Sequence, residues 1–383
     1  MAFLEKIWDL GASILPFLVV LLIIVFVHEM GHFLIARHYG VQVTTFSVGY
    51  GSELCGWTDK KGTRWRISSL PIGGYVMMLG DADATSVRAD LDKVKDDDRS
   101  KTVHSKTPWQ RIMISFGGPL FNLLFTIIVI ASIGIWKGIP DVVPVIQSVS
   151  DNSVASKCGL QANDLITGLG DKTVTKLSEM SQYLKLYNGM DTEIHYRREG
   201  KDCVAPISLY ELDSAGNKTP VSVLGVALSG EMIYEHVSPG KALLSALQYC
   251  YFSAKSTTRG LTKMITRENN GAQLGGIFSI GEGVNKSLSM GIVPFFTFMA
   301  MLSFSLAFFN LLPIPVLDGG SIFLNTIELI IRRPISAMFT NVVYFIGMGV
   351  VGLMMIVALW NDVVRMGFVG KVVSFVQTLF GGK

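Results

Sequence analysis

The sequence has little charge. Only 16% of its 383 residues are Asp, Glu, Lys or Arg, whereas 49% are hydrophobic, and the mean hydropathy is +0.43. This balance argues against an ordinary soluble protein and predicts a polytopic membrane protein that carries a soluble portion. The formal net charge of +3 is too small to indicate nucleic-acid binding, so no nucleic acid is expected among the partners.

Cysteine is also scarce. The four cysteines, Cys55, Cys158, Cys203 and Cys250, form no C-x-x-C pair, which argues against a zinc ribbon or a thioredoxin-like motif. Cys158 and Cys203 fall in one candidate domain, where we expect free thiols rather than a disulfide. The N-terminal region lacks the basic stretch and small-residue cleavage site of a removable signal peptide, so the first apolar segment is expected to be retained.

Four stretches are long and apolar enough to cross a bilayer, which takes about 20 helical residues. They are residues 14–36, 112–136, 292–312 and 342–360. A fifth stretch, 242–265, is interrupted by basic residues and predicts an amphipathic helix at the membrane interface. The expected segments are an N-terminal segment with the first span (1–36), a loop (37–111), the second span (112–136), a soluble domain (137–240), an interfacial segment (241–291), the third span with the motif that follows it (292–321), a loop (322–341) and the fourth span with the tail (342–383).

The sequence VHEMGHFLIA in the first span carries a His-Glu-x-x-His motif. At 3.6 residues per turn, His28 and His32 lie one above the other on a helix face, where both imidazoles can bind one metal ion, and zinc is the metal this motif predicts. Glu29 lies beside them, where zincin-type sites have the group that takes a proton from the attacking water. Ionisable residues at bilayer depth are costly and usually functional. The alternative is that the two histidines and Glu29 face the polar interior of a transporter or simply pair with one another.

A third ligand is predicted after the third span, in the sequence PIPVLDGG. Pro313 and Pro315 break the helix and Gly319–Gly320 permit an unusual backbone, so Asp318 can turn back toward the helix bundle. Spans one and three run in the same direction, which places Asp318 on the same side of the membrane as the two histidines. Two His and one carboxylate form a three-ligand site with an open fourth position, as in catalytic zinc sites. A solvated aspartate at a helix end is the alternative.

The loop between the first two spans begins with a predicted β-hairpin. Residues 44–81 alternate between apolar and polar side chains, with a turn at Lys60–Gly62. The hairpin can dip into the bilayer beside the metal site or lie on the membrane surface. Residues 81–106 form a charged linker.

The soluble portion, residues 137–240, is more polar than the rest of the chain. Its sequence SVASKCGLQANDLITGLGDKTV, residues 153–174, resembles the signature of PDZ domains and departs from it at Cys158 and Asn163. A PDZ domain binds extended peptides by adding a strand to a sheet edge. A structural lid is the alternative role.

Two asparagines are expected near the metal. Asn122 follows Gly117–Pro119, which loosens the second span, and Asn310 precedes the PIPVLDGG sequence. Either amide can hydrogen-bond a substrate strand or a developing oxyanion, and either can instead join two helices. Basic residues are concentrated in the loop after the first span, which places the metal side in the cytoplasm and the soluble domain outside.

The motifs together resemble the site-2 protease family, in the order in which that family has them, and look closest to the bacterial branch typified by the regulator of sigma-E protease. The likeness covers nearly the whole chain. It rests on HEMGH in the first span, RISSLPIGGYVMMLGD at 66–81, WQRIMISFGGPLFN at 109–122, the PDZ-like stretch, LGGIFSIGEG at 274–283 and NLLPIPVLDGG at 310–320.

The resemblance implies a role for each candidate residue. His28, His32 and Asp318 would bind Zn²⁺, and Glu29 would be the catalytic base. Asn122 and Asn310 would lie by the substrate. Gly73, Gly74 and Tyr75 would belong to a membrane-associated β element that guides the substrate.

The implied fold is a polytopic α-helical membrane protein with four transmembrane helices, a membrane-associated β-hairpin and an inserted PDZ-like α+β domain. The implied activity is an intramembrane zinc endopeptidase of the bacterial inner membrane, active in a stress response. Its substrates would be single-span membrane proteins already cut outside by a site-1 type protease, such as an anti-sigma factor, or remnant signal peptides.

Some features depart from the family or favour other functions. There is room for one PDZ domain where the best-known member has two, and Met77, Ile277 and Ser321 replace residues common in the family. One rival interpretation is another membrane zincin with a downstream glutamate as third ligand. The other is a catalytically silent membrane scaffold that recruits partners through the PDZ-like domain. Glu29 argues against the scaffold, because a scaffold needs no base.

Overall fold

The computed structural model describes residues 2–81, 94–151, 153–212, 218–220, 224–229, 231–266 and 276–365. The chain divides into two compact units. The larger comprises Met1–Ile130 and Ala246–Lys383, and the smaller is Ala131–Ser245. The smaller unit contains the soluble domain expected at 137–240.

Four helices of the described chain are long and apolar enough to span a membrane. They are α1 (Ala2–His38), α2 (Pro108–Trp136), α7 (Ile292–Asn310) and α9 (Ala337–Arg365). The spanning parts are Ile14–His38, Pro108–Trp136, Ile292–Asn310 and Met338–Arg365. The four predicted spans are therefore confirmed, each with somewhat different ends.

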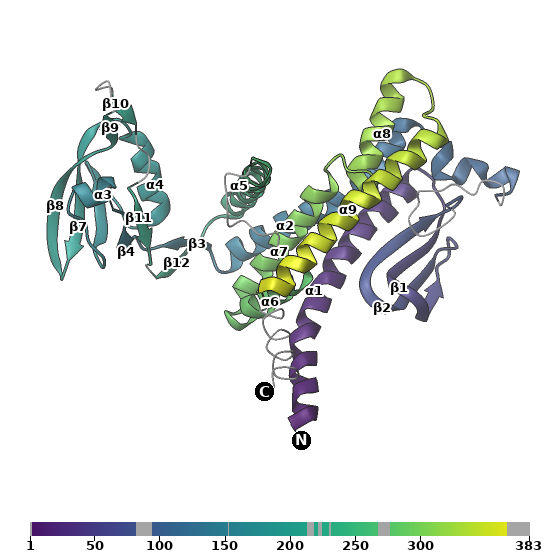
Figure 1. Ribbon diagram of the computed structural model, residues 1–383, viewed down its shortest axis with the longest axis horizontal. Helices are drawn as coiled ribbons and strands as arrows, with labels where there is room; N and C mark the ends of the chain where they lie inside the picture. The colour runs from purple at the N-terminus through teal and green to yellow at the C-terminus, as the bar shows by residue number, and fades with distance from the viewer. Residues whose placement is uncertain are drawn as a thin grey trace, which may run out of the picture. The chain divides into compact units, whose positions relative to one another are not determined.

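One shorter helix of the larger unit packs among the spans (Figure 1). Helix α6 (Ile277–Ser289) contacts α1, α7 and α9. The Asp362 carboxylate of α9 accepts hydrogen bonds from the N–H groups of Gly276 (3.0 Å) and Phe278 (2.9 Å), which caps the N-terminus of α6. This cap fixes one end of α9 against the bundle.

The segment after the third span differs from the expected loop at 322–341. Helix α8 (Asp318–Ile331) begins at the aspartate itself and ends at Arg332, whose φ of 57° is left-handed. Apolar side chains recur at Leu324, Ile327 and Ile331, the spacing of an amphipathic helix. An acidic residue in the first turn also favours a helix start. These local signals override the loop prediction for residues 322–331.

The predicted hairpin consists of strands β1 (Val43–Thr58) and β2 (Arg64–Met78), which are paired antiparallel beside α1 (Figure 1). The pairing register changes along the strands. The segment Val43–Val48 pairs with Gly74–Met78 and also with Arg64–Ile67. The first part of β1 therefore lies between two parts of β2. Phe46 and Val76 of the hairpin are buried with Phe33 of α1 in one core cluster. That core holds the end of β2 beside the first span.

The charged linker at 81–106 is described from residue 94 onward. It contains two short 3₁₀ helices, η2 (Asp96–Lys101) and η3 (Val103–Ser105). Residues 82–93 lie outside the described part of the chain.

The smaller unit is an α+β domain built around one hydrophobic core. Its central sheet has the strand order β6-β5-β7-β8. Ile146, Ile166 and Ile194 are among its fully buried side chains. Its elements are β3 (Ile139–Val142), β4 (Ile146–Val149), α3 (Val154–Lys157), β5 (Leu165–Leu169), β6 (Lys172–Thr173), α4 (Leu177–Leu186), β7 (Asp191–Arg198), β8 (Lys201–Ser208), β9 (Tyr210–Leu212), β10 (Lys218–Pro220), β11 (Val226–Leu228) and β12 (Met232–Glu235).

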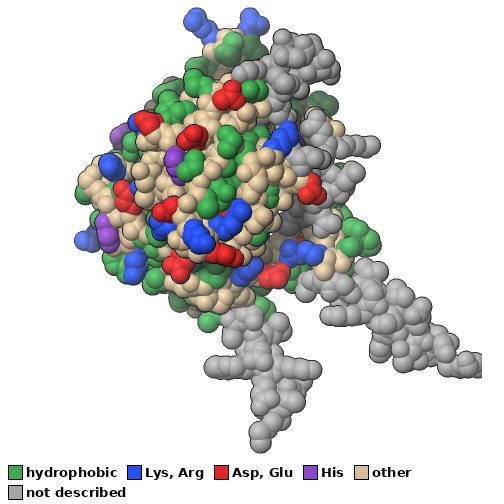
Figure 2. Space-filling view, turned by 90° about the vertical axis from the view of Figure 1, so that its left-hand side faces the viewer, with side chains coloured by type: hydrophobic (Ala, Val, Ile, Leu, Met, Phe, Trp, Pro, Cys, Tyr) green, Lys and Arg blue, Asp and Glu red, His purple; other side chains and the backbone are tan. Residues whose placement is uncertain are grey.

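The PDZ-like stretch at 153–174 forms α3, β5 and β6 of this domain. Asn163 has a left-handed φ of 71°, a conformation that asparagine tolerates better than most residues other than glycine. Cys158 and Cys203 are free and half-buried. Figure 2, viewed from the side of this domain, shows acidic and basic side chains interspersed, as on a surface that faces water.

The predicted interfacial segment contains helix α5 (Pro239–Ile265) before α6. Leu243, Leu247 and Tyr251 are exposed along one side of α5, while Ala242 and Ala246 are buried on another. The helix is therefore amphipathic, as expected. With the four spans, the hairpin and the inserted α+β domain, the predicted fold class is confirmed.

Candidate metal centre and active site

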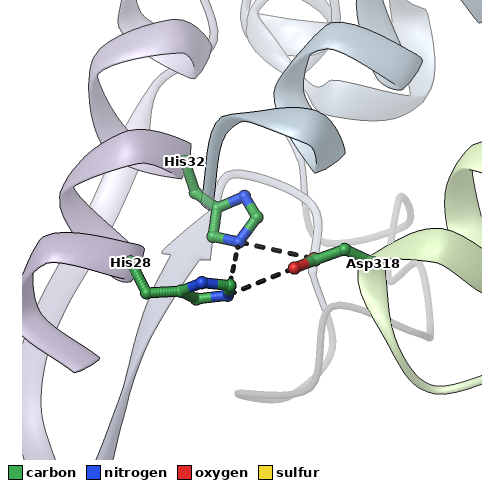
Figure 3. A group of neighbouring side chains, drawn as sticks. All are labelled: His28, His32 and Asp318. Atoms are coloured by element: carbon green, nitrogen blue, oxygen red, sulfur yellow. Dashed lines mark hydrogen bonds and ion pairs between the residues drawn. The ribbon is translucent and has the colours of Figure 1, made fainter. Parts of the chain in front are cut away.

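Helix α1 positions two histidines on one face, one turn apart. The His28 and His32 rings meet edge to face with centroids 4.9 Å apart, and their Nε2 atoms are 3.2 Å apart (Figure 3). His28 is 8% exposed, so it lies inside the protein. Two imidazole nitrogens this close together are placed to bind one cation.

Asp318, the first residue of α8, faces the same point from the opposite side (Figure 3). Its Oδ2 is 3.1 Å from His28 Nε2, and its Oδ1 is 3.4 Å from His32 Nε2. The turn before α8 includes Val316 at a φ of 85°, and such strained backbone clusters at functional sites. The predicted turning back of Asp318 toward the bundle is what the structure shows.

The three residues have the geometry of a zinc site. Their ligand atoms all lie within 4.8 Å of one another, and their separations of 3.1–3.4 Å match the roughly 3.3 Å between ligand atoms around a tetrahedral zinc with bonds of about 2.0 Å. Two imidazole nitrogens and one carboxylate are also a donor set that catalytic zinc uses. The residues present therefore fit the ion.

Glycines bring α2 against this face of α1. A β-carbon on Gly117 would lie 2.6 Å from the Gly31 carbonyl oxygen, so only glycine permits this helix contact. A β-carbon on Gly118 would lie 2.6 Å from His28 Cε1. Gly118 thus provides the space in which the imidazoles lie.

Helix α2 also contacts the outer nitrogen of each imidazole. His32 Nδ1 is 2.9 Å from the Ile114 carbonyl oxygen, and His28 Nδ1 is 3.2 Å from the Asn122 side-chain amide. Asn122 is 0% exposed. The Asn122 amide is enclosed between helices and faces His28, as in the helix-joining alternative, and its contact with substrate stays a prediction.

The candidate site opens into a cavity of about 940 Å³. Glu29, Asn310, Gly74 and Tyr75 line it, while Gly73 directly precedes Gly74 in β2 and has a left-handed φ of 81°. Their roles as base and substrate contacts stay predictions. Glu29 receives a backbone hydrogen bond from Val76. The base candidate and the end of β2 are therefore direct neighbours.

Sequence reasoning missed part of the cavity wall. Tyr50, His104, Arg111, Glu328 and Tyr344 also line it. Arg111 Nη2 and Glu328 Oε1 form an ion pair of 2.6 Å that joins α2 to α8. A charged residue at the very start of a span was the one available signal for Arg111, and nothing in the sequence paired it with Glu328.

Charges at the ends of the hairpin are fixed by hydrogen bonds. Burial alone would raise the pKa of Asp59, but bonds from the Thr63 N–H, the Trp65 indole and the Arg37 guanidinium hold it well below its usual range. Asp59 is therefore charged at neutral pH and ties the hairpin turn to the end of α1.

On the cavity wall, burial, with the Arg111 guanidinium nearby, lowers the pKa of His104.

Comparison with known proteins gives close relatives over nearly the full length. A candidate zinc metalloprotease of Agrobacterium fabrum is 32% identical over 364 residues, which cover 92% of this chain and 96% of that protein. A candidate zinc metalloprotease of Mesorhizobium japonicum is 33% identical and covers 91% and 98%. Metalloprotease MmpA of Caulobacter vibrioides is 30% identical and covers 91% and 94%.

Two solved structures match part of the chain. The PDZ domain of an SdrC-like protein of Listeria monocytogenes covers 24% of this chain and 88% of that domain, at 26% identity and a TM-score of 0.18. The corresponding domain of Listeria innocua covers 24% and 98%, at 23% identity and a TM-score of 0.19.

Residues 16–355 match the model of the family described as Peptidase family M50. This match extends from the first span to the fourth and includes all three candidate ligands. It confirms the family that the motifs predicted, and it confirms an enzyme rather than a scaffold. The chain belongs to peptidase family M50, the site-2 protease family, and is a membrane-embedded metalloprotease that uses zinc.

Proposed function

We propose that this metalloprotease is an intramembrane endopeptidase that cuts the transmembrane segments of single-span membrane proteins. The observation that carries the proposal is the convergence of His28 and His32, inside the first candidate membrane span, with Asp318, next to a cavity that Glu29 lines. A protease site among membrane-spanning helices is suited to peptide bonds that lie in the bilayer.

The three ligands and Glu29 have separate roles. Zinc held by His28, His32 and Asp318 would supply Lewis acidity to the scissile carbonyl and a lower pKa to the attacking water. Glu29 takes the proton of that water and delivers it to the leaving amine. Asn310, on the cavity wall, is placed to donate a hydrogen bond to the substrate backbone.

The outer edge of β2 is a platform for an extended substrate. The N–H of Val76 bonds to Glu29 and the N–H of Met78 donates to Asp81 Oδ2 at 2.8 Å, so these alternate amides point away from β1. By the same alternation, the amide of Gly74 also lies on the outer edge, and Gly74 lines the cavity. A transmembrane helix hides its carbonyls in internal hydrogen bonds, so the substrate has to unwind, and pairing with this edge at Gly74 offsets part of that cost.

The substrate class and location follow from the family resemblance and the charge pattern. We assign as substrates anti-sigma-factor-like proteins already cut outside by a site-1 type protease, and remnant signal peptides. The concentration of basic residues after the first span supports a multi-pass protein of the bacterial inner membrane with the metal on the cytoplasmic side. The inserted domain would then lie outside and exclude substrates with bulky outer domains.

The test is cleavage of a tagged single-span reporter with a truncated outer domain by the purified chain and by Glu29→Gln. Zinc content is measured on both proteins. Cleavage by the parent alone, with about one zinc in each, is the expected result. Equal cleavage by the two proteins would remove Glu29 from the mechanism, and zinc content well below one in the parent would remove the metal site.

The β2 platform has its own test in synthetic substrate peptides that carry one N-methylated amide each. Successive amides of a strand point to opposite sides. Cleavage is therefore expected to fall at every second N-methylated position near the cut. A uniform effect along the peptide would contradict strand addition, and the unmethylated peptide is the control.

A further inference from the structure

We propose that Asn122 is a positioning residue for the metal centre: its side-chain oxygen accepts the Nδ1 proton of His28 and so fixes which nitrogen of His28 binds the metal. This inference rests on the proposed zinc site. It gives helix α2 a function in metal binding although α2 supplies none of the three candidate ligands.

The geometry of His28 identifies its ligand atom. Nε2 is 3.1 Å from Asp318 Oδ2 and 3.2 Å from His32 Nε2, so Nε2 faces the metal position. A neutral imidazole that binds a metal through one nitrogen carries its proton on the other. The Nδ1 atom of His28 must therefore be a donor, and a buried donor needs an acceptor.

His32 shows the same arrangement already complete. Its Nδ1 donates to the Ile114 carbonyl oxygen at 2.9 Å, while its Nε2 faces Asp318 Oδ1. A backbone carbonyl can only accept, so the protonated nitrogen of His32 is fixed by the fold. His28 has a side chain in the equivalent place, because Asn122 lies two helical turns after Ile114 on α2.

The amide of Asn122 is placed to complete the pattern. Its Nδ2 is 3.2 Å from His28 Nδ1, and its Oδ1 is buried without a hydrogen-bond partner among the described residues. A half-turn of the amide exchanges the two atoms, because Asn carries a donor and an acceptor of similar size. In that orientation Oδ1 accepts from His28 Nδ1–H, so one rotation gives a partner to the buried oxygen and an acceptor to the metal-binding histidine.

The backbone of Asn122 is held in place independently of this amide. Its carbonyl oxygen accepts from Thr126 Oγ1 at 2.9 Å and from Ser303 Oγ at 3.0 Å. All three residues are 0% exposed. Outer partners of metal-binding histidines fix the ring and raise its basicity. The anchored carbonyl gives Asn122 the rigidity for that role.

The proposal predicts different outcomes for two substitutions of similar volume at Asn122. Asn122→Asp keeps an acceptor, and Asn122→Leu keeps the volume but removes it. We expect Asn122→Leu to weaken zinc binding by about 10–100-fold, as loss of such a partner does elsewhere, and Asn122→Asp to stay close to the parent. Ser303→Ala is the matched packing control, because Thr126 still holds the Asn122 carbonyl, and its zinc affinity should equal that of the parent.

The readout is metal binding by the full chain in detergent, without any cleavage assay. Zinc affinity is measured by competition with a chromophoric chelator, and the Co²⁺-loaded proteins are compared by their visible absorption spectra. Parent-like affinity and spectrum in Asn122→Leu would overturn the proposal, as would an equal loss in Ser303→Ala. A parent that binds zinc tightly but cuts no reporter would overturn the proposed function alone, while a parent without zinc binding would overturn both.

Discussion

Gly118→Ala tests whether the close contact between α2 and the imidazoles is essential to the metal site. The new β-carbon would lie 2.6 Å from His28 Cε1 and 2.7 Å from His28 Nε2, and it would also contact His32 Nε2. Ordinary van der Waals contact begins near 3.4 Å, so the His28 ring has to move by about 0.8 Å. Zinc–nitrogen bonds tolerate only about 0.2 Å.

The expected result is a selective loss of metal. A ring displaced by several times the bond tolerance no longer binds, so zinc affinity should fall at least about 100-fold, which corresponds to about 2.7 kcal/mol. The fold should survive, since replacing a mid-helix glycine by alanine favours the helix by about 0.5–1 kcal/mol and the clash involves side chains that can rotate. Zinc competition and thermal unfolding of the apo protein measure the two effects.

Neighbouring glycines provide the controls. Gly117→Ala would place its β-carbon 2.6 Å from the Gly31 carbonyl oxygen, which is backbone and cannot rotate away, so this variant should lose thermal stability. Gly349→Ala in α9 meets nothing within 4 Å and should change neither property much. The reasoning fails if Gly118→Ala binds zinc like the parent, or if it unfolds as readily as Gly117→Ala.

Three further predictions follow from the same structure. A chelator should abolish cleavage and lower the unfolding temperature, and zinc at about 100 times its dissociation constant should restore about 2.7 kcal/mol, seen by thermal unfolding. Breaking the Arg111–Glu328 pair in either single alanine variant should cost about 1–3 kcal/mol, and the charge-swapped double variant should recover most of it by the same assay. Burial alone would raise the pKa of Asp164, but Arg198 and the Gln161 N–H hold it below its usual value, so its stabilisation is complete above about pH 3.9 and is lost as the pH falls through the folded value. Asp164→Asn should therefore lower stability at neutral pH by about 2 kcal/mol and flatten the acid dependence, and a parent-like pH profile of unfolding would contradict this.

The sequence was informative wherever chemistry depends on spacing along one element. His28 and His32 are one turn apart, so any helix through them places both on one face, and the apolar runs determine the four spans through length alone. Asp318 was found because prolines and glycines around it require a break after the span. The metal site could therefore be assembled before the fold was known.

Contacts between different helices and strands could not be predicted from the sequence alone. The sequence left two roles open for Asn122, substrate contact and a hydrogen bond between helices, because its position in the second span identified it as polar and near the metal but left its direction open. The deciding facts are the close contact of Gly117 with Gly31, which depends on α1, and the hydrogen bond from Ser303 to the Asn122 carbonyl, which depends on α7. A period of 3.6 residues says which side chains share a face, but not what that face meets.

The same limit explains the residues of α2 as a group. Ile114, Gly118 and Asn122 are spaced by four residues, so they form one stripe of the helix. Ile114 contributes a backbone carbonyl, Gly118 has no side chain and Asn122 has an amide, and none of the three by itself indicates a metal site. The stripe lies opposite His28 and His32, which are also four residues apart. The Ile114 carbonyl contacts the His32 ring, the Asn122 amide contacts the His28 ring, and Gly118 leaves space for both rings. Two helices with the same period can therefore face each other at one candidate metal site, with both histidines on α1 and the groups that contact their outer nitrogens on α2, while Asp318 comes from α8.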